Sequence, residues 1–317
     1  MASIGIIIND KSDRTASVMT DLLYVTKRFS NVCTEVLDGV RGLGRALTSM
    51  NRQNVDTLIL AGGDGTMQAV FTDVINNRRF EHAPNFVALP CGMTNVIAND
   101  CGLQGSPARS LDNFLWRSQK GDVKPLSRAL LQIKPSDADP VYGFFVGAGG
   151  FCSAVEYSRN SIQSKGAKRS IALAASTVGY IAKVALNPEG SISPVELELL
   201  HTDGETTAPS ERSDRLLYLS TTLSRLGNGI YPFWGTGEGP MVSTLVGYPA
   251  PRFIRAATRI VRAKSMPWFE QNGYHSWRSN TQTLSFDGHY VFDGEFFTAE
   301  RDKPLVLETS KHANFLN

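Results

Sequence analysis

The chain has 317 residues, a formal net charge of +2 and a hydrophobic content of 42%. This length is sufficient for two domains with a substantial core, and the composition is ordinary for a globular protein. Because the net charge is close to zero, we expect no nucleic-acid partner. The four cysteines form no CxxC pair, which argues against a zinc site or a disulfide framework and indicates a reducing compartment.

The beginning of the chain lacks the basic region of a secretory signal peptide and becomes polar at Asn9-Asp10-Lys11. No apolar run in the sequence approaches the length of a membrane span, since even the apolar, helix-like segment 171–186 is interrupted by polar residues. These two features predict a cytoplasmic protein.

The first predicted strand covers residues 4–8 and is followed by a polar turn with Asn9 and Ser12. Apolar residues at helical spacing predict a helix from about Thr15. Taken alone, this junction is typical of an ordinary surface turn.

A second junction follows the predicted strand 55–61 and has the sequence Gly62-Gly63-Asp64-Gly65-Thr66. Its three glycines permit positive φ and the close approach of a ligand to the backbone. The helix after it offers unpaired N–H groups and the positive end of its dipole, as phosphate sites do. Because Asp64 repels phosphate, we expect it to orient Mg²⁺, a water molecule or a substrate hydroxyl. The alternative is a tight turn with a capped helix and no ligand.

A third junction follows the predicted strand 85–89. The turn Pro90-Cys91-Gly92-Met93-Thr94-Asn95 contains a glycine, a hydroxyl and an amide, and a short helix over residues 96–100 should end at Gly102. A capped turn is the alternative here too. Together, the three junctions predict one site at the carboxyl edge of an α/β sheet.

The organisation of the chain changes near a linker-like segment at residues 121–125. Strands and helices alternate before it, which predicts an α/β domain with a parallel sheet over residues 1–122. After it, predicted strands at 129–133, 141–146, 195–200, 216–220 and 283–286 indicate a larger antiparallel β-rich domain over residues 123–303. A helical insertion is expected at about 170–186.

The glycine turn at residues 62–66 resembles the signature of the diacylglycerol kinase catalytic-domain family, which includes sphingosine and ceramide kinases. Gly92 lies in a turn similar to the second glycine turn of that family, and Asp293-Gly294-Glu295 resembles its late acidic motif. The resemblance implies a nucleotide-binding domain, a lipid-binding domain, and a final segment, about residues 304–317, that returns to the first domain. It also implies ATP in a cleft with Mg²⁺ on its phosphates.

A lipid kinase transfers the γ-phosphoryl group of ATP to a lipid hydroxyl, which loses its proton as it attacks. The resemblance makes Asp293 the first choice as general base and Asp64 the second. For Asp293-Gly294 the alternative is a hairpin turn, and the nearby Asp287-Gly288 pair is expected to form one. The nucleotide-binding residues implied are Asn9, Ser12, Gly62, Gly63, Gly65, Thr66, Gly92, Thr94, Asn95 and Glu295.

Two positions depart from the family pattern. Val96 stands where many members have Asp, and sphingosine-type members tend to have an apolar residue there, which favours a sphingolipid acceptor. Glu238-Gly239 stands where bacterial diacylglycerol kinases often place an Asp-Gly pair linked to a structural metal, so a metal ligand set is not assigned.

Arg252, Arg255, Arg259 and Arg262 recur at helical spacing beside apolar residues. Such a face suits an anionic membrane surface, and the alternative is a solvated charged face on a core-packed helix. A weaker cluster contains Lys165, Lys168 and Arg169. We therefore expect a peripheral membrane enzyme, with homo-oligomer formation left open. Competing hypotheses are a soluble kinase such as an NAD kinase, and a non-catalytic lipid-binding relative.

Overall fold

The computed structural model describes residues 3–12, 15–135, 137–165, 194–227 and 230–317. The chain forms two compact units, Met1–Arg128 with His312–Asn317, and Ala129–Lys311. The expected helical insertion at 170–186, and Lys168 and Arg169 of the weaker basic cluster, lie outside the described residues.

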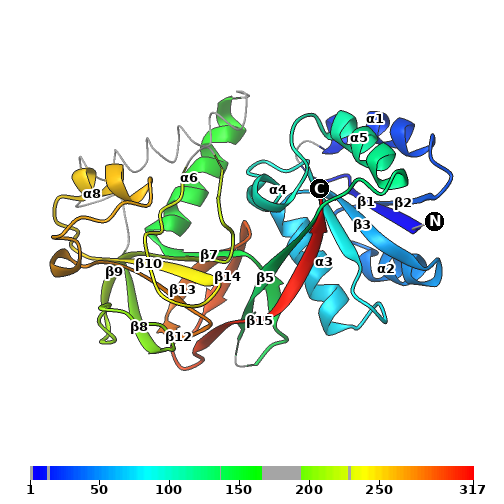
Figure 1. Cartoon of the computed structure of the whole chain (residues 1–317). Coiled ribbons are helices and arrows are strands. Elements are labelled where there is room, and N and C mark those ends of the chain that lie inside the picture. The colour runs from blue at the N-terminus through cyan, green and yellow to red at the C-terminus, as the bar shows by residue number, and fades with distance from the viewer. Residues whose placement is uncertain (1–2, 13–14, 136, 166–193, 228–229) are drawn as a thin grey trace. The chain divides into compact units, whose positions relative to one another are not determined.

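The N-terminal unit is an α/β domain built on a parallel sheet (Figure 1). Its strands are β1 (Ser3–Asn9), β2 (Val32–Leu37), β3 (Val55–Gly62) and β4 (Asn85–Pro90), in the order β2-β1-β3-β4. Its helices are α1 (Thr15–Thr26), α2 (Leu43–Arg52), α3 (Asp64–Asn76), α4 (Val96–Cys101) and α5 (Pro107–Gln119). The predicted α/β fold with a parallel sheet is confirmed.

Both faces of this sheet are covered. Helices α1 and α5 pack together over one face, where Leu22 and Phe114 join a core with Ile6 and Ile59, while α2 and α3 lie on the other (Figure 1). Ile6, Ile7 and Ile8 are therefore fully buried although they point to alternating faces. This explains why β1 is a continuous apolar run.

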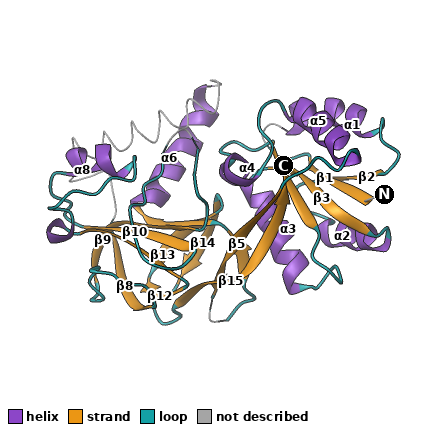
Figure 2. Ribbon diagram, in the orientation of Figure 1, coloured by secondary structure: helices purple, strands orange, loops and turns teal. Residues whose placement is uncertain are grey.

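The second unit is rich in antiparallel strands (Figure 2). Its strands are β5 (Pro125–Lys134), β6 (Val141–Gly143), β7 (Phe145–Gly149), β8 (Val195–Thr202), β9 (Ser213–Thr221), β10 (Met241–Gly247), β11 (Tyr274–Ser279), β12 (Thr281–Phe286), β13 (Gly288–Phe292), β14 (Glu295–Ala299) and β15 (Leu305–Leu316). Its helices are α6 (Gly150–Lys165), α8 (Phe253–Ile260) and the short η1 (Glu270–Asn272). The predicted antiparallel β-rich region is confirmed.

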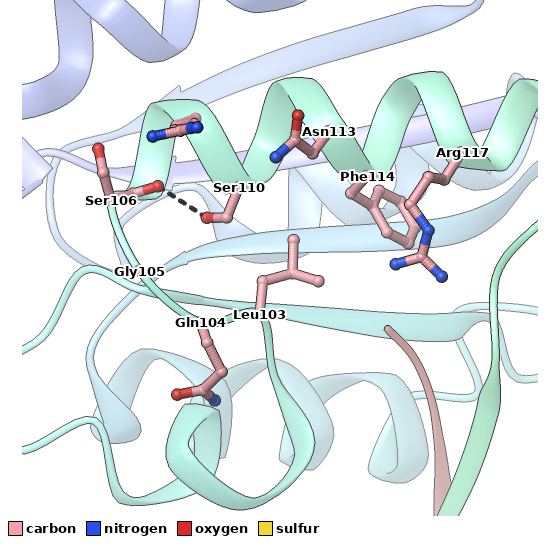
Figure 3. A pocket seen from close by; sticks show the side chains of 9 residues that line it. Leu103, Gln104, Gly105, Ser106, Ser110, Asn113, Phe114 and Arg117 are labelled. Atoms are coloured by element: carbon pink, nitrogen blue, oxygen red, sulfur yellow. Dashed lines mark hydrogen bonds between the residues drawn. The ribbon is translucent and has the colours of Figure 1, made fainter.

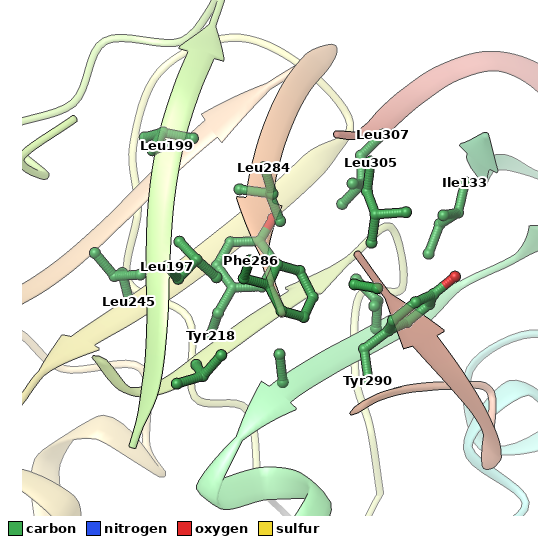
Figure 4. Close-up of a cluster of buried hydrophobic side chains, with 14 of the residues drawn as sticks. Ile133, Leu197, Leu199, Tyr218, Leu245, Leu284, Phe286, Tyr290, Leu305 and Leu307 are labelled. Carbon is green, nitrogen blue, oxygen red and sulfur yellow. The ribbon is translucent and has the colours of Figure 1, made fainter. Parts of the chain in front are cut away.

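The core of the second unit lies between its strands. One cluster combines apolar side chains of β8, β9, β12, β13 and β15 (Figure 4). It includes Leu197, Tyr218, Leu284, Phe286, Tyr290, Leu305 and Leu307. Two further apolar clusters lie beneath the helices, one with Ala256 and Ile260 of α8 and one with Phe151 of α6. Leu217 of β9 packs against both clusters, so the two helices lie on the same face of this sheet.

Two local predictions in the second unit were wrong. The strand expected over 141–146 is interrupted at Phe144, whose N–H leaves the strand pattern to bind the Asp293 carboxylate. The pair Asp287-Gly288 does not form a hairpin turn, because β12 pairs with β8 and β15 whereas β13 pairs with β7 and β14.

The two units are joined by strands rather than by a loop. The division at Arg128 falls inside β5, and the division at Lys311 falls inside β15. No helix among the described residues is long and apolar enough to span a membrane.

Candidate functional site

The candidate site lies at the carboxyl ends of three neighbouring strands, β1, β3 and β4. In the order β2-β1-β3-β4, β2 lies on one side of β1, and the next strand, β3, lies on the other side. The strand order therefore reverses direction between β1 and β3, which is the topological switch point. Ligands of open α/β sheets bind at such a point, outside the carboxyl ends of the strands. The three turns predicted from the sequence follow these three strands.

Polar side chains tie the first turn to the other two. The Asn9 amide nitrogen donates a hydrogen bond to the Thr66 hydroxyl at 2.7 Å, at the start of α3. The Ser12 hydroxyl donates to the main-chain carbonyl of Cys91 at 3.1 Å, in the turn after β4. Asn9 and Thr66 are both buried. The first turn, which is unremarkable in sequence, therefore connects both glycine turns.

The two glycine turns touch through their main chains. A Cβ atom placed on Gly92 would lie 2.5 Å from the Cα of Gly63, closer than such atoms approach in proteins. A side chain at position 63 would be less crowded, since a Cβ on Gly63 would lie 3.4 Å from the Cα of Gly92. Gly92 is thus required for this approach, whereas Gly63 leaves space at the N-terminus of α3.

Asp64 lies in the glycine turn after β3, and its carboxylate bonds to the glycine turn after β4. One carboxylate oxygen accepts hydrogen bonds from the Thr94 hydroxyl at 2.6 Å and the Val96 N–H at 3.1 Å, and the other accepts from the Ile97 N–H at 3.0 Å. The carboxylate therefore caps the first turn of α4. Burial raises the pKa of Asp64, and these three hydrogen bonds oppose the rise. In this arrangement Asp64 positions the two turns.

Asn95 stabilises the second glycine turn internally. Its side-chain oxygen accepts from the Gly92 N–H at 2.7 Å and its amide donates to the Gly92 carbonyl at 2.9 Å. The residue has φ of 52°, a left-handed conformation that Asn adopts more readily than most residues. The turn is thereby closed before α4 begins.

The polar side chains of the site are used to hold its backbone. All four of the buried polar residues Asn9, Asp64, Thr66 and Asn95 form side-chain hydrogen bonds. Asn9, Asp64 and Thr66 bond to a neighbouring turn, whereas Asn95 bonds within its own turn. Gly65 lies in the first turn of α3, where the intrahelical ladder begins with the Thr66 and Met67 N–H groups bonding to the Gly63 carbonyl, so the N–H groups before them need partners outside this ladder. A phosphate group fits such a helix N-terminus next to glycines. The chemistry offered here is therefore phosphate binding by main-chain N–H groups.

Asp293 lies in the second unit, in the turn between β13 and β14. Asp293 and Gly294 have φ of 47° and 88°, and the flanking residues Phe292 and Glu295 pair directly. The pair therefore forms a two-residue hairpin turn, the alternative left open for it in the sequence.

The carboxylate of Asp293 also has a defined environment. It is 5% exposed, and its two oxygens accept from the N–H groups of Phe144 and Phe145, each at 2.9 Å. A side chain on Gly143 would overlap this carboxylate, so the glycine makes room for it. Glu295, the next acidic residue, is exposed. The hairpin turn thus holds one buried carboxylate whose orientation is set by two main-chain donors.

The structure brings together nine of the predicted residues in the N-terminal unit: Asn9, Ser12, Gly62, Gly63, Gly65, Thr66, Gly92, Thr94 and Asn95. Asp64 lies among them, whereas Asp293 and Glu295 belong to the second unit. Sequence reasoning missed the main-chain partners, namely the Cys91 carbonyl and the N–H groups of Phe144 and Phe145. Gly143, directly before Phe144, was the one sequence feature that could have indicated a close approach of another group to this backbone.

Within the described residues there is no group of three or more His, Cys, Asp or Glu side chains that could hold a divalent cation. Both oxygens of Asp64 are already used in hydrogen bonds.

A cavity of about 500 Å³ lies elsewhere in the N-terminal unit, along α5 and the loop before it (Figure 3). Its lining includes Arg109, Asn113 and Arg117 on the polar side and Leu103 and Phe114 on the apolar side. None of the residues of the three turns lines it. We therefore place the candidate site at the turns, on their chemistry, and not at this cavity.

Comparison with known proteins agrees with this geometry. Residues 3–125 match the model of the diacylglycerol kinase catalytic domain, a range that contains all three turns. The matched range is the N-terminal part of the chain, and the likeness to this catalytic domain is limited to it. The domain match ends before Asp293, so it makes no statement about that carboxylate. No curated protein matches the chain significantly.

Solved structures extend the likeness to the whole length of the chain. A diacylglycerol kinase from Bacillus anthracis str. Sterne is 15% identical with a TM-score of 0.65, and the match covers 99% of this chain and 96% of that one. A candidate diacylglycerol kinase from the same strain is 13% identical with the same TM-score and coverage. At such identities the likeness shows a shared fold.

Proposed function

We propose that this protein is an ATP-dependent lipid kinase. The donor is the Mg²⁺ salt of ATP, and the acceptor is a hydroxyl of a membrane lipid of the ceramide, sphingoid or diacylglycerol type. Val96, in place of an acidic residue, favours a sphingolipid. The observation that carries the proposal is the set of three turns joined by the Asn9–Thr66 and Ser12–Cys91 hydrogen bonds, within the range that matches the diacylglycerol kinase catalytic-domain model.

The turns of the N-terminal unit supply nucleotide binding in this proposal. Main-chain N–H groups at the start of α3 bind phosphate oxygens, and the glycines at 63 and 65 let them approach. Phosphoryl transfer depends mainly on positioning and on charge stabilisation. The role of Asp64 is then to keep the two glycine turns together through Thr94, Val96 and Ile97.

Asp293 is the proposed general base. The lipid oxygen attacks the γ-phosphorus of ATP, the bond from that phosphorus to the β–γ bridging oxygen breaks, and ADP leaves. The proton of the lipid hydroxyl passes to the Asp293 carboxylate. The two main-chain donors that orient this carboxylate support the assignment, because a base must be held within hydrogen-bond reach of the proton it accepts.

The first test is a screen with radiolabelled ATP against ceramide, sphingoid bases, diacylglycerol and NAD. Label on a lipid supports the proposal. Label on NAD alone would overturn it in favour of a soluble kinase, and ATP binding without transfer to any lipid would favour a non-catalytic lipid-binding relative.

The variant Asp293→Asn tests the base. Asn accepts positive φ, so the hairpin turn is expected to persist. We expect kcat to fall by about 10²–10⁴-fold, the usual contribution of a general base, with little change in ATP affinity measured by calorimetry. Full activity would refute the assignment.

Two further variants make this test specific. Asp287→Asn alters a nearby Asp-Gly pair, whose carboxylate is exposed and pairs with Arg301, and it should retain activity. Asp64→Asn should instead weaken ATP binding, because the amide cannot accept hydrogen bonds from all three donors. If Asp64→Asn lowered kcat alone, Asp64 would replace Asp293 as the base.

A further inference from the structure

A strongly basic surface surrounds α8 in the second unit. It consists of Arg252, Arg255, Arg259, Arg262 and Lys264, and we call these five residues the basic face. All five are exposed. Arg255 and Arg259 lie within the helix, while the other three flank its ends.

The basic face is held in place by the core behind it. Ala256 and Ile260 are buried on the opposite side of α8, in a cluster with Val246 and Tyr274 of the sheet. Arg252 precedes the helix, with φ of 57°, and its guanidinium lies over the ring of Trp268 at 5.6 Å from the ring centre. The helix therefore cannot turn its arginines inward without losing this packing.

The charge of this surface is not balanced locally. No Asp or Glu occurs between Glu238 and Glu270, a segment that contains the whole basic face. Within the described part of the chain, none of the five side chains forms an ion pair. Five positive charges therefore lie on this one surface, although the net charge of the whole protein is only +2.

An exposed apolar side chain lies among these charges. Ile254, next to Arg255, is 57% exposed, although an isoleucine is usually buried. A short helix with cations and an apolar group on its outer side suits the boundary between lipid headgroups and acyl chains. A purely electrostatic partner such as nucleic acid would leave Ile254 without a role.

We propose that the basic face and Ile254 form a docking surface for an anionic lipid membrane. The arginines contact negatively charged headgroups, and Ile254 inserts between them. This inference is separate from catalysis, because binding to vesicles requires neither ATP nor a phosphorylatable lipid.

The test is co-sedimentation of the full chain with phosphatidylcholine vesicles, with and without phosphatidylserine. We expect binding to the anionic vesicles only, weakening as the salt concentration rises. The variant Arg255→Glu/Arg259→Glu should weaken binding by at least about 30-fold, since each basic residue near an anionic surface contributes about 1 kcal/mol. Ile254→Ser should weaken it by less while leaving the salt dependence intact.

The matched control is Arg45→Glu/Arg52→Glu on α2 of the other unit, which changes the net charge equally at two exposed arginines. It should bind like the unaltered protein. Equal losses in both double variants would overturn the proposal, because net charge alone would then explain binding. So would a loss of affinity for short duplex DNA in the α8 variant while vesicle binding is unchanged. All variants alter exposed side chains, and their melting temperatures verify the fold.

Discussion

The two buried aspartates, Asp64 and Asp293, differ in their hydrogen-bond partners. Asp64 accepts three hydrogen bonds from the second glycine turn, so its carboxylate acts as a structural joint. Asp293 accepts two, both from the main chain of a neighbouring strand region. In the sequence the two residues are equivalent, as each is an Asp beside glycine. Their different surroundings support the choice of Asp293 as the proposed base.

His275 in the second unit is expected to make the free energy of unfolding depend on pH. Burial lowers the pKa of His275, the Glu270 carboxylate opposes this, and the Arg215 guanidinium adds to it. Below about pH 6.5 the unfolded chain therefore binds a proton that the folded chain does not, and stability falls as pH falls. The expected loss is at most about 1.4 kcal/mol per pH unit.

The measurement is urea unfolding at about pH 7.5 and about pH 5.5. The variant His275→Asn can keep a polar group near Thr207, which now contacts the imidazole at 3.1 Å, and it should lose part of the pH dependence. His82→Asn, at an exposed position, should keep all of it. An unchanged pH dependence in His275→Asn would contradict the role given to this residue.

Elements meet at the site through main chain more than through side chains. The turn after β3 and the turn after β4 approach so closely that only glycine fits at position 92, and α3 and α4 begin directly from these turns. Strand and helix positions were predictable because their apolar spacing is local. The contact between the turns was not, because it depends on how neighbouring strands align.

This contact predicts that two glycine substitutions affect different properties, one mainly stability and the other mainly ATP binding. Gly92→Ala should lower stability by about 1–3 kcal/mol, because the added methyl group meets main-chain atoms that cannot move aside. Gly63→Ala should cost less than about 1 kcal/mol but weaken ATP binding, because its methyl group stands at the start of α3. Thermal unfolding and calorimetric titration with ATP distinguish the two. A stable Gly92→Ala variant would mean that the turns can separate without cost.

At the scale of the whole molecule, the end of the chain returns to the unit in which it began. Residues 312–317 belong to the N-terminal unit, and Phe315 of β15 pairs with Phe86 of β4. Phe315 has no exposed surface, and its ring lies 6.1 Å from that of Phe71 and 6.2 Å from that of Phe86. The last strand therefore completes the core of the N-terminal unit.

Removal of this ring should destabilise one unit specifically. Phe315→Ala is expected to cost about 3–5 kcal/mol, the usual range for a buried Phe. Hydrogen exchange should rise in β3 and β4 but not in β9 and β10. Asn314→Ala, at the exposed neighbouring position, should change stability by no more than about 0.5 kcal/mol. Equal exchange in both units would show that they unfold together.

The sequence by itself determined the α/β class of the first unit, the β-rich second unit and the positions of the three turns. Hydrophobic spacing and glycine placement are local properties, so neighbouring residues suffice to predict them. Only the tertiary structure decided the partners of the two carboxylates. The N–H of Phe144 is 149 residues away from Asp293 in the chain, and that of Ile97 is 33 away from Asp64. Main-chain donors are chemically the same at every residue, so folding alone selects which of them a carboxylate meets.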